Sequence, residues 1–205
     1  MKKILFLLII SLNVLIKAQK FNRIDSLVIE MSLDPGSGPD YNIIQIHFNK
    51  NQFHIKYHLY EKFDENGYKN DSSLISLRKE YKANNEEINQ SIREKINKIR
   101  NRHTKFYIKE LKLKNSNYKS YISEVNHVSK ISQQNVEDEK NKNASYFHGV
   151  WVRFYFYEGN KKKKLVASAL EKDNFGTLYN LLIHTLNLYR EKKNDENFNK
   201  KTFGY

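Results

Sequence analysis

Two histidines could share a metal ion, provided that the segment 41–60 forms a β-hairpin. His47 and His54 stand symmetrically about Lys50 and Asn51, so a turn at these two residues would place the histidines directly opposite each other. Side chains paired in this way have Cβ atoms about 5 Å apart, which lets both imidazoles reach one metal ion. Two ligands are too few, and the sequence places no third one. The alternative is a pair of histidines on a solvated sheet face.

A second candidate surface alternates aromatic and cationic side chains. The segment 150–170 is typical of a β-hairpin that turns at Gly159 and Asn160, and strand alternation then separates a core face from an outer face. Aromatic rings beside cations can stack on bases or sugar rings and hold phosphates or sulfates. The structural alternative is that aromatic residues favour strands and that lysines protect a sheet edge. The outer face would carry Trp151, Arg153, Tyr155, Tyr157, Lys162 and Lys164.

Established catalytic patterns are missing from the sequence. It contains no nucleophile elbow, no phosphate-binding or dinucleotide-binding loop and no H-E-x-x-H helix. Cysteine is absent, which excludes disulfides, a thiol nucleophile and thiolate metal sites. The sequence therefore implies no cofactor, and the hydrophobic core must supply the stability.

The first nineteen residues have the pattern of a cleavable export signal. Lys2 and Lys3 precede the mostly apolar run 4–16, and Ala18 supplies the small residue that signal peptidase requires near the cut. The run is shorter than the roughly 20 apolar residues that cross a bilayer, which disfavours a membrane anchor as the alternative. We therefore expect a signal peptide over 1–19, a mature protein in the periplasm or outside the cell, and no membrane span after cleavage.

The chain is strongly basic. Its formal net charge is +13, and about +10 remains once the predicted leader with its three lysines is removed. A positive balance of this size favours polyanionic partners. A lysine-rich background composition explains the same charge equally well. Export argues against intracellular nucleic acid as the natural target, so a protein or a polyanionic component of the envelope is the expected partner.

The hairpin at 41–60 is the element that would position the histidines. Turn chemistry and period-two alternation agree on both strands, and a one-residue slip in register would expose the whole apolar set. The expected core face carries Ile44, Ile46, Phe48, Phe53, Ile55, Tyr57 and Leu59. The other face carries Tyr41, Ile43, Gln45, His47, His54, Lys56, His58 and Tyr60.

Other segments complete the predicted elements. A strand precedes the hairpin at 24–31, and a proline- and glycine-rich loop at 34–40 ends it. A helix begins with a capping box at Asn84 and Glu87 and then presents isoleucines four, four and three residues apart. We further expect turns at 64–73, a strand at 106–113, a helix at 118–128, a loop at 133–145 and a final helix from a cap at Asp173 or Asn174 to about Lys192.

These elements predict an α+β fold. Two hairpins and the early strand would build an antiparallel sheet of about five strands, with two or three helices packed on one face. The chain would divide into the leader, one α+β domain over 20–192 and a flexible C-terminal tail over 193–205. The leading hypothesis is a small exported, non-enzymatic binding or accessory protein that acts through its basic aromatic surface. The alternative is a metal-dependent or other hydrolase with a site near His47 and His54.

Overall fold

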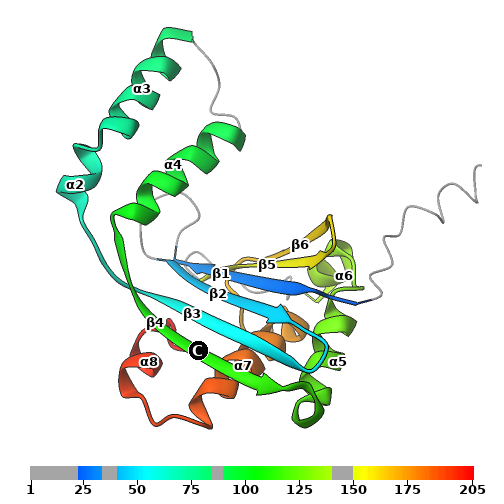
Figure 1. Cartoon of the computed structure of the whole chain (residues 1–205). Helices are drawn as coiled ribbons and strands as arrows, with labels where there is room; N and C mark the ends of the chain where they lie inside the picture. The colour runs from blue at the N-terminus through cyan, green and yellow to red at the C-terminus, as the bar shows by residue number, and fades with distance from the viewer. Residues whose placement is uncertain (1–22, 34–40, 85–89, 140–149) are drawn as a thin grey trace, which may run out of the picture.

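Six strands form one antiparallel sheet in the computed structural model, which describes residues 23–33, 41–84, 90–139 and 150–205 (Figure 1). The order across the sheet is β4-β3-β2-β1-β5-β6. The predicted α+β class is thereby confirmed, with one strand more than the expected five. The strands are β1 (Ser26–Ser32), β2 (Tyr41–Phe48), β3 (Gln52–Phe63), β4 (Thr104–Lys114), β5 (Trp151–Glu158) and β6 (Lys161–Ala167).

Both predicted hairpins have the expected register. In the β2–β3 hairpin His47 lies opposite His54, and in the β5–β6 hairpin Tyr155 lies opposite Lys164. Gly159 has a φ of 52° in the turn between β5 and β6, a backbone conformation that glycine adopts without strain. Alternation along the strands therefore sorts side chains onto two faces of the sheet as the sequence indicates.

Three helices cover one face of the sheet, which we call the covered face (Figure 1). They are α5 (Lys119–Val128), α7 (Gly176–Arg190) and α8 (Glu196–Lys200). The core lies between these helices and alternate strand residues such as Ile46, Phe53, Tyr57 and Phe154, which are fully buried. The Tyr57 hydroxyl donates to the Thr185 carbonyl of α7 at 2.8 Å, so the sheet's buried hydroxyl finds its partner in a covering helix.

Helix α6 (Gln133–Asp138) closes the outer edge of the sheet at β6. The Gln133 side chain donates to the Val166 carbonyl at 3.0 Å and accepts from the Val166 amide at 2.9 Å, as a neighbouring strand would. The sequence predicted a loop here, and this helix corrects it. Ser132 and Asn135 form the capping box that identifies its start.

The C-terminal segment packs on the core rather than forming the predicted flexible tail over 193–205. Its helix α8 carries Phe198, which is fully buried. The Phe198 ring stacks on Tyr189 with centroids 4.3 Å apart and meets Tyr57 edge to face at 5.1 Å. These aromatic contacts hold the segment against the end of the core, and the tail prediction is corrected accordingly.

Helix α7 begins after the predicted cap. Asn174 is buried, and its side-chain amide donates to the Ala169 carbonyl at 3.2 Å instead of capping the helix. The N-cap residue is Phe175, which has a φ of 66° and makes no side-chain capping bond. Packing of the buried Phe175 ring therefore fixes this helix start where the sequence suggested a polar cap.

A helical arm projects from one end of the sheet between β3 and β4 (Figure 1). A small core of Leu74, Leu77 and Ile99 joins its two longer helices. The isoleucine stripe predicted for the second of these helices is confirmed for its described part, because Ile92 and Ile96 pack against that core, whereas Ile88 lies outside the described residues. The arm consists of α2 (Glu65–Lys69), α3 (Ser72–Asn84) and α4 (Gln90–Arg102).

The predicted boundaries of the arm need correction. The stretch 64–73 was expected to be turns, whereas it contains α2 and the start of α3. Asn84, the expected cap, is the last residue of α3, and the remaining capping residues fall within 85–89, outside the described residues. The predicted leader over 1–19 and the loop at 34–40 also lie outside them.

Candidate functional site

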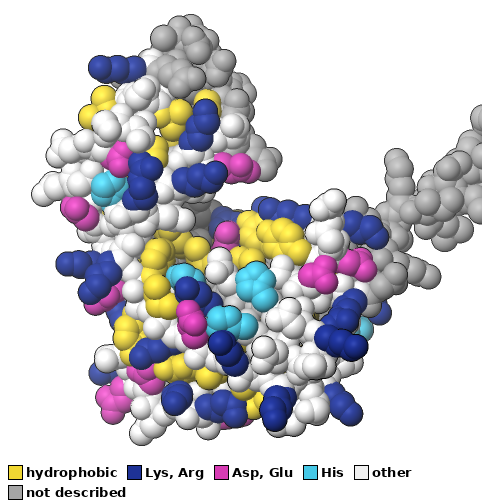
Figure 2. Space-filling model, in the orientation of Figure 1, with side chains coloured by type: hydrophobic (Ala, Val, Ile, Leu, Met, Phe, Trp, Pro, Cys, Tyr) yellow, Lys and Arg dark blue, Asp and Glu magenta, His cyan; other side chains and the backbone are white. Residues whose placement is uncertain are grey.

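The second face of the sheet, which we call the open face, carries none of the helices α5 to α8 (Figure 1). Its side chains remain partly exposed, in contrast to the buried residues that alternate with them. Figure 2 shows histidine, cationic and hydrophobic side chains gathered on this face below the arm. The open face includes Glu30, Tyr41, His47, His54, Lys56, His58, Ile108, Glu110, Lys112, Trp151, Arg153, Tyr155, Tyr157, Lys162 and Lys164.

Four residues of the β5–β6 hairpin bring cations onto aromatic rings at one end of the open face. We call Tyr155, Tyr157, Lys162 and Lys164 the cation–aromatic patch. The Lys162 ammonium lies 4.6 Å from the Tyr155 ring centroid and 5.6 Å from the Tyr157 centroid. The Lys164 ammonium lies 5.9 Å from the Tyr155 centroid. All three distances are within the range in which a ring attracts a cation.

An acidic side chain that the sequence analysis missed lies next to the patch on the open face. Tyr155 donates its hydroxyl to Glu30 of β1 at 3.2 Å. Burial, followed by the negative charge of Glu30, raises the pKa of Tyr155 well above its ordinary value, so this hydroxyl stays protonated. Glu30 pairs in register with Arg153, so two residues of opposite charge occupy neighbouring strand positions next to the patch. Trp151 continues the same face along β5.

The lysine between the two patch lysines points to the other side of the sheet. Lys163 donates from its ammonium to the Ser129 carbonyl at 2.6 Å and also to the Ile131 carbonyl, both just after α5. Burial lowers the pKa of Lys163. The run of lysines in β6 therefore serves two purposes: Lys162 and Lys164 face outward, while Lys163 holds the end of a covering helix.

The two candidate metal ligands lie opposite each other, but His54 also has an acidic neighbour. His54 Nε2 lies 3.3 Å from a Glu110 carboxylate oxygen, without the alignment of a hydrogen bond, and Lys56 approaches the other oxygen of Glu110 at 3.1 Å. The hydrogen bond from Lys56 lowers the pKa of Glu110. His47 is exposed. Within the described ranges, no group of three or more His, Cys, Asp and Glu side chains is placed to hold a metal ion.

His58 lies further along the open face, beside the arm. Its ring meets Phe106 edge to face with centroids 5.8 Å apart. Burial, followed by the nearby charge of Lys56, lowers the pKa of His58, so the ring is neutral at pH 7. Tyr41 packs against the same Phe106 ring at 5.5 Å and its hydroxyl contacts Asn101 of α4. An aromatic corner thus forms where the arm meets the sheet.

No known protein family, curated protein or solved structure matches this chain. Its function must therefore be argued from the chemistry of its own surfaces. None of the described helices is both long and apolar enough to cross a membrane.

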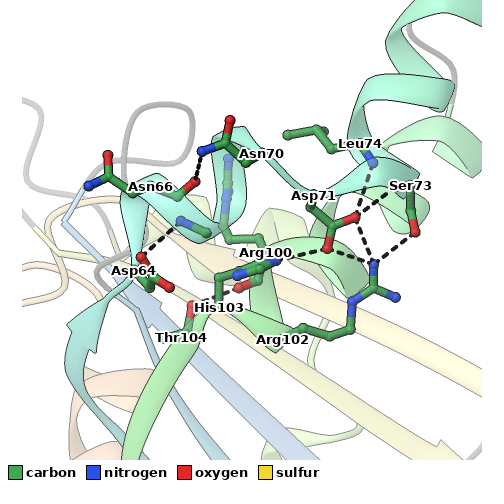
Figure 3. A network of polar contacts seen from close by, with 11 residues as sticks. Asp64, Asn66, Asn70, Asp71, Ser73, Leu74, Arg100, Arg102, His103 and Thr104 are labelled. Carbon is green, nitrogen blue, oxygen red and sulfur yellow. Dashed lines mark hydrogen bonds and ion pairs between the residues drawn. The ribbon is translucent and has the colours of Figure 1, made fainter.

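A polar network at the base of the arm joins the start of α3 to the end of α4 (Figure 3). Asp71 caps α3 through the Ser73 amide at 2.8 Å and also receives His103 Nε2 at 2.8 Å and Arg102 Nη2 at 3.0 Å. The hydrogen bond from His103 is the main reason why the pKa of Asp71 lies well below its usual range. Asp64 caps α2 through the Gly67 amide at 2.9 Å. The sequence analysis missed these helix starts, although an aspartate directly before a helix is the signal that could have revealed both caps.

Proposed function

We propose that this protein is a non-enzymatic binding protein of the cell envelope or exterior, and that it binds a polyanionic partner on the open face of its sheet. The observation that carries the proposal is the cation–aromatic patch, in which the Lys162 ammonium lies over two tyrosine rings. The predicted leader supports the location, and the basic net charge supports the choice of partner.

The patch is preorganised for an anion in the unbound protein. Tyr155 and Tyr157 are half-buried within the sheet, so their rings hold fixed positions, while Lys162 and Lys164 are exposed. Neither lysine forms an ion pair with an acidic side chain in the described part of the chain. A ring that already orients a lysine reduces the side-chain entropy lost on binding. A sulfate or phosphate could then contact the ammonium groups while a sugar ring stacks on the exposed part of a tyrosine ring face.

The form of the surface favours binding over catalysis. The patch lies on a sheet face with mixed aromatic and polar side chains, as protein recognition surfaces do. Catalytic sites usually gather several polar groups in a concave pocket. The alternative of a metal-dependent or other hydrolase at His47 and His54 stays a prediction, and no contact of these residues in the described structure favours it over binding.

Heparin, a sulfated polysaccharide, is a suitable probe for the patch. We expect Lys162→Gln to weaken heparin binding about two- to fivefold at low salt, because one exposed cation–π and ion contact is worth roughly 0.5–1 kcal/mol. Isothermal titration calorimetry of the mature protein at two salt concentrations measures this change. The salt dependence should also become shallower, since one cation fewer meets the polyanion.

Lys119→Gln is the matched control for this experiment. Lys119 is an exposed lysine at the start of α5, beside the covered face, and its replacement removes the same charge. Heparin affinity of this variant should equal that of the unmodified protein. Equal losses in the two variants would show that net charge alone attracts heparin, and the proposal would then fail.

A further inference from the structure

A depression of about 340 Å³ opens beside the end of β6, on the side of the covering helices and away from the patch. Its volume falls in the range of small-molecule sites, about 300–1,000 Å³. Leu170, a core residue, forms part of its wall. The other lining residues that matter here are Ala169, Glu171, Tyr179, Phe203, Gly204 and Tyr205.

Backbone strain gathers around this depression. Ala169 has a φ of 53° and Phe203 a φ of 56°, which are left-handed conformations that side chains disfavour, and Gly204 follows with a φ of 84°. Strained residues persist only where surrounding structure enforces them, and they cluster at functional sites. Of the three non-glycine residues with positive φ in the described chain, two line this one depression.

The walls of the depression are aromatic and carry one carboxylate. The rings of Tyr179 and Tyr205 lie 6.1 Å apart at 59°, so they form two inclined walls, and Phe203 supplies a third ring to the lining. The Tyr205 hydroxyl donates to the Leu170 carbonyl at 2.7 Å, which fixes that ring. Burial raises the pKa of Tyr205 well above its ordinary value, and the charge of Glu171, which lines the same depression, adds to the shift.

We propose that this depression binds a small organic cation, an ammonium group on a flat apolar body. Aromatic rings attract cations through their faces, and several rings around one position form the cage that recognises alkylated ammonium groups. Glu171 is exposed at the rim and supplies the opposite charge. Lys172 also lines the depression and works against the cation, which predicts modest affinity. The site is separate from the open face and does not depend on the function proposed above.

Three probes that differ in one end group test the proposal. Phenethylamine carries an ammonium, 2-phenylethanol a neutral hydroxyl and 3-phenylpropionate a carboxylate on the same aromatic body. Saturation-transfer NMR with the mature protein should give phenethylamine the tightest binding, about threefold or more above the alcohol. Glu171→Gln should remove this preference, whereas Lys172→Gln should enlarge it.

Two further variants separate recognition from folding. Glu65→Gln replaces an exposed glutamate of the arm, and it should keep the preference for phenethylamine. Tyr179→Leu removes one ring, and it should weaken all three probes while thermal unfolding stays cooperative. The proposal is overturned if no probe binds, if 3-phenylpropionate binds as tightly as phenethylamine, or if Glu171→Gln keeps the preference.

Discussion

At the scale of single residues, Asp195 shows how one carboxylate joins three elements. It accepts from the hydroxyls of Tyr107 at 3.0 Å and Tyr189 at 2.9 Å, from Lys109 at 3.3 Å and from the Phe198 amide at 3.1 Å. Burial by itself raises the pKa of Asp195, but these bonds to the ionised form outweigh it and leave the pKa below its ordinary value. The sequence placed these residues in separate segments, so it could not predict their meeting.

Asp195→Asn tests this network through its pH dependence. The variant should unfold more readily at pH 7, by about 1–3 kcal/mol, because the amide replaces a hydrogen-bonded carboxylate. A depressed folded-state pKa stabilises the protein above the unfolded pKa of about 3.9 and loses that effect as pH falls through the folded value. Urea unfolding should therefore show that the difference in the free energy of unfolding between variant and parent shrinks below about pH 5. If the difference in unfolding free energy stays constant down to pH 3, the ionised Asp195 carboxylate does not stabilise the fold as described.

At the scale of elements, strand alternation predicted which residues share a face of the sheet. It did not predict which other elements contact each face. The sequence placed Lys162 and Lys164 together and left Lys163 unexplained. Its partners, the carbonyls after α5, come from a segment more than thirty residues away. The same limit applied to the arm, where Leu74 and Leu77 of α3 form a core with Ile99 of α4 and Tyr68 of α2 packs against it.

Lys163→Gln should therefore change mainly the stability, and Lys162→Gln mainly the heparin binding. The first should lower the free energy of unfolding by about 1–2 kcal/mol, because an ammonium bond to helix-end carbonyls is lost. It should leave heparin affinity nearly unchanged. The second should weaken heparin binding and leave stability within about 0.5 kcal/mol of the parent. Chemical denaturation and calorimetry on both variants measure the two quantities. Loss of binding in Lys163→Gln at full stability would reverse our assignment of faces.

At the scale of the whole molecule, the sequence predicted the fold class but not the order of the strands. Hairpin pairing is local, and both hairpins followed from turn chemistry and alternation. The pairing of β1 with β5 joins residues more than one hundred positions apart, which puts β1 in the centre of the sheet. No local pattern specifies such a contact. That pairing brings Glu30 within hydrogen-bond distance of the Tyr155 hydroxyl, so the acidic partner of the patch could not be predicted from the sequence either.

Binding of a polyanion on the open face is tested most directly by observing which lysines contact it. Lysines methylated with ¹³C retain their charge, and each gives an NMR signal that single variants assign. On addition of a sulfated heparin oligosaccharide, we predict the largest shifts at Lys162 and Lys164, smaller shifts at Lys56 and none at Lys119. Largest shifts at Lys95 and Lys98 of the arm, or equal shifts at all exposed lysines, would contradict binding by the open face.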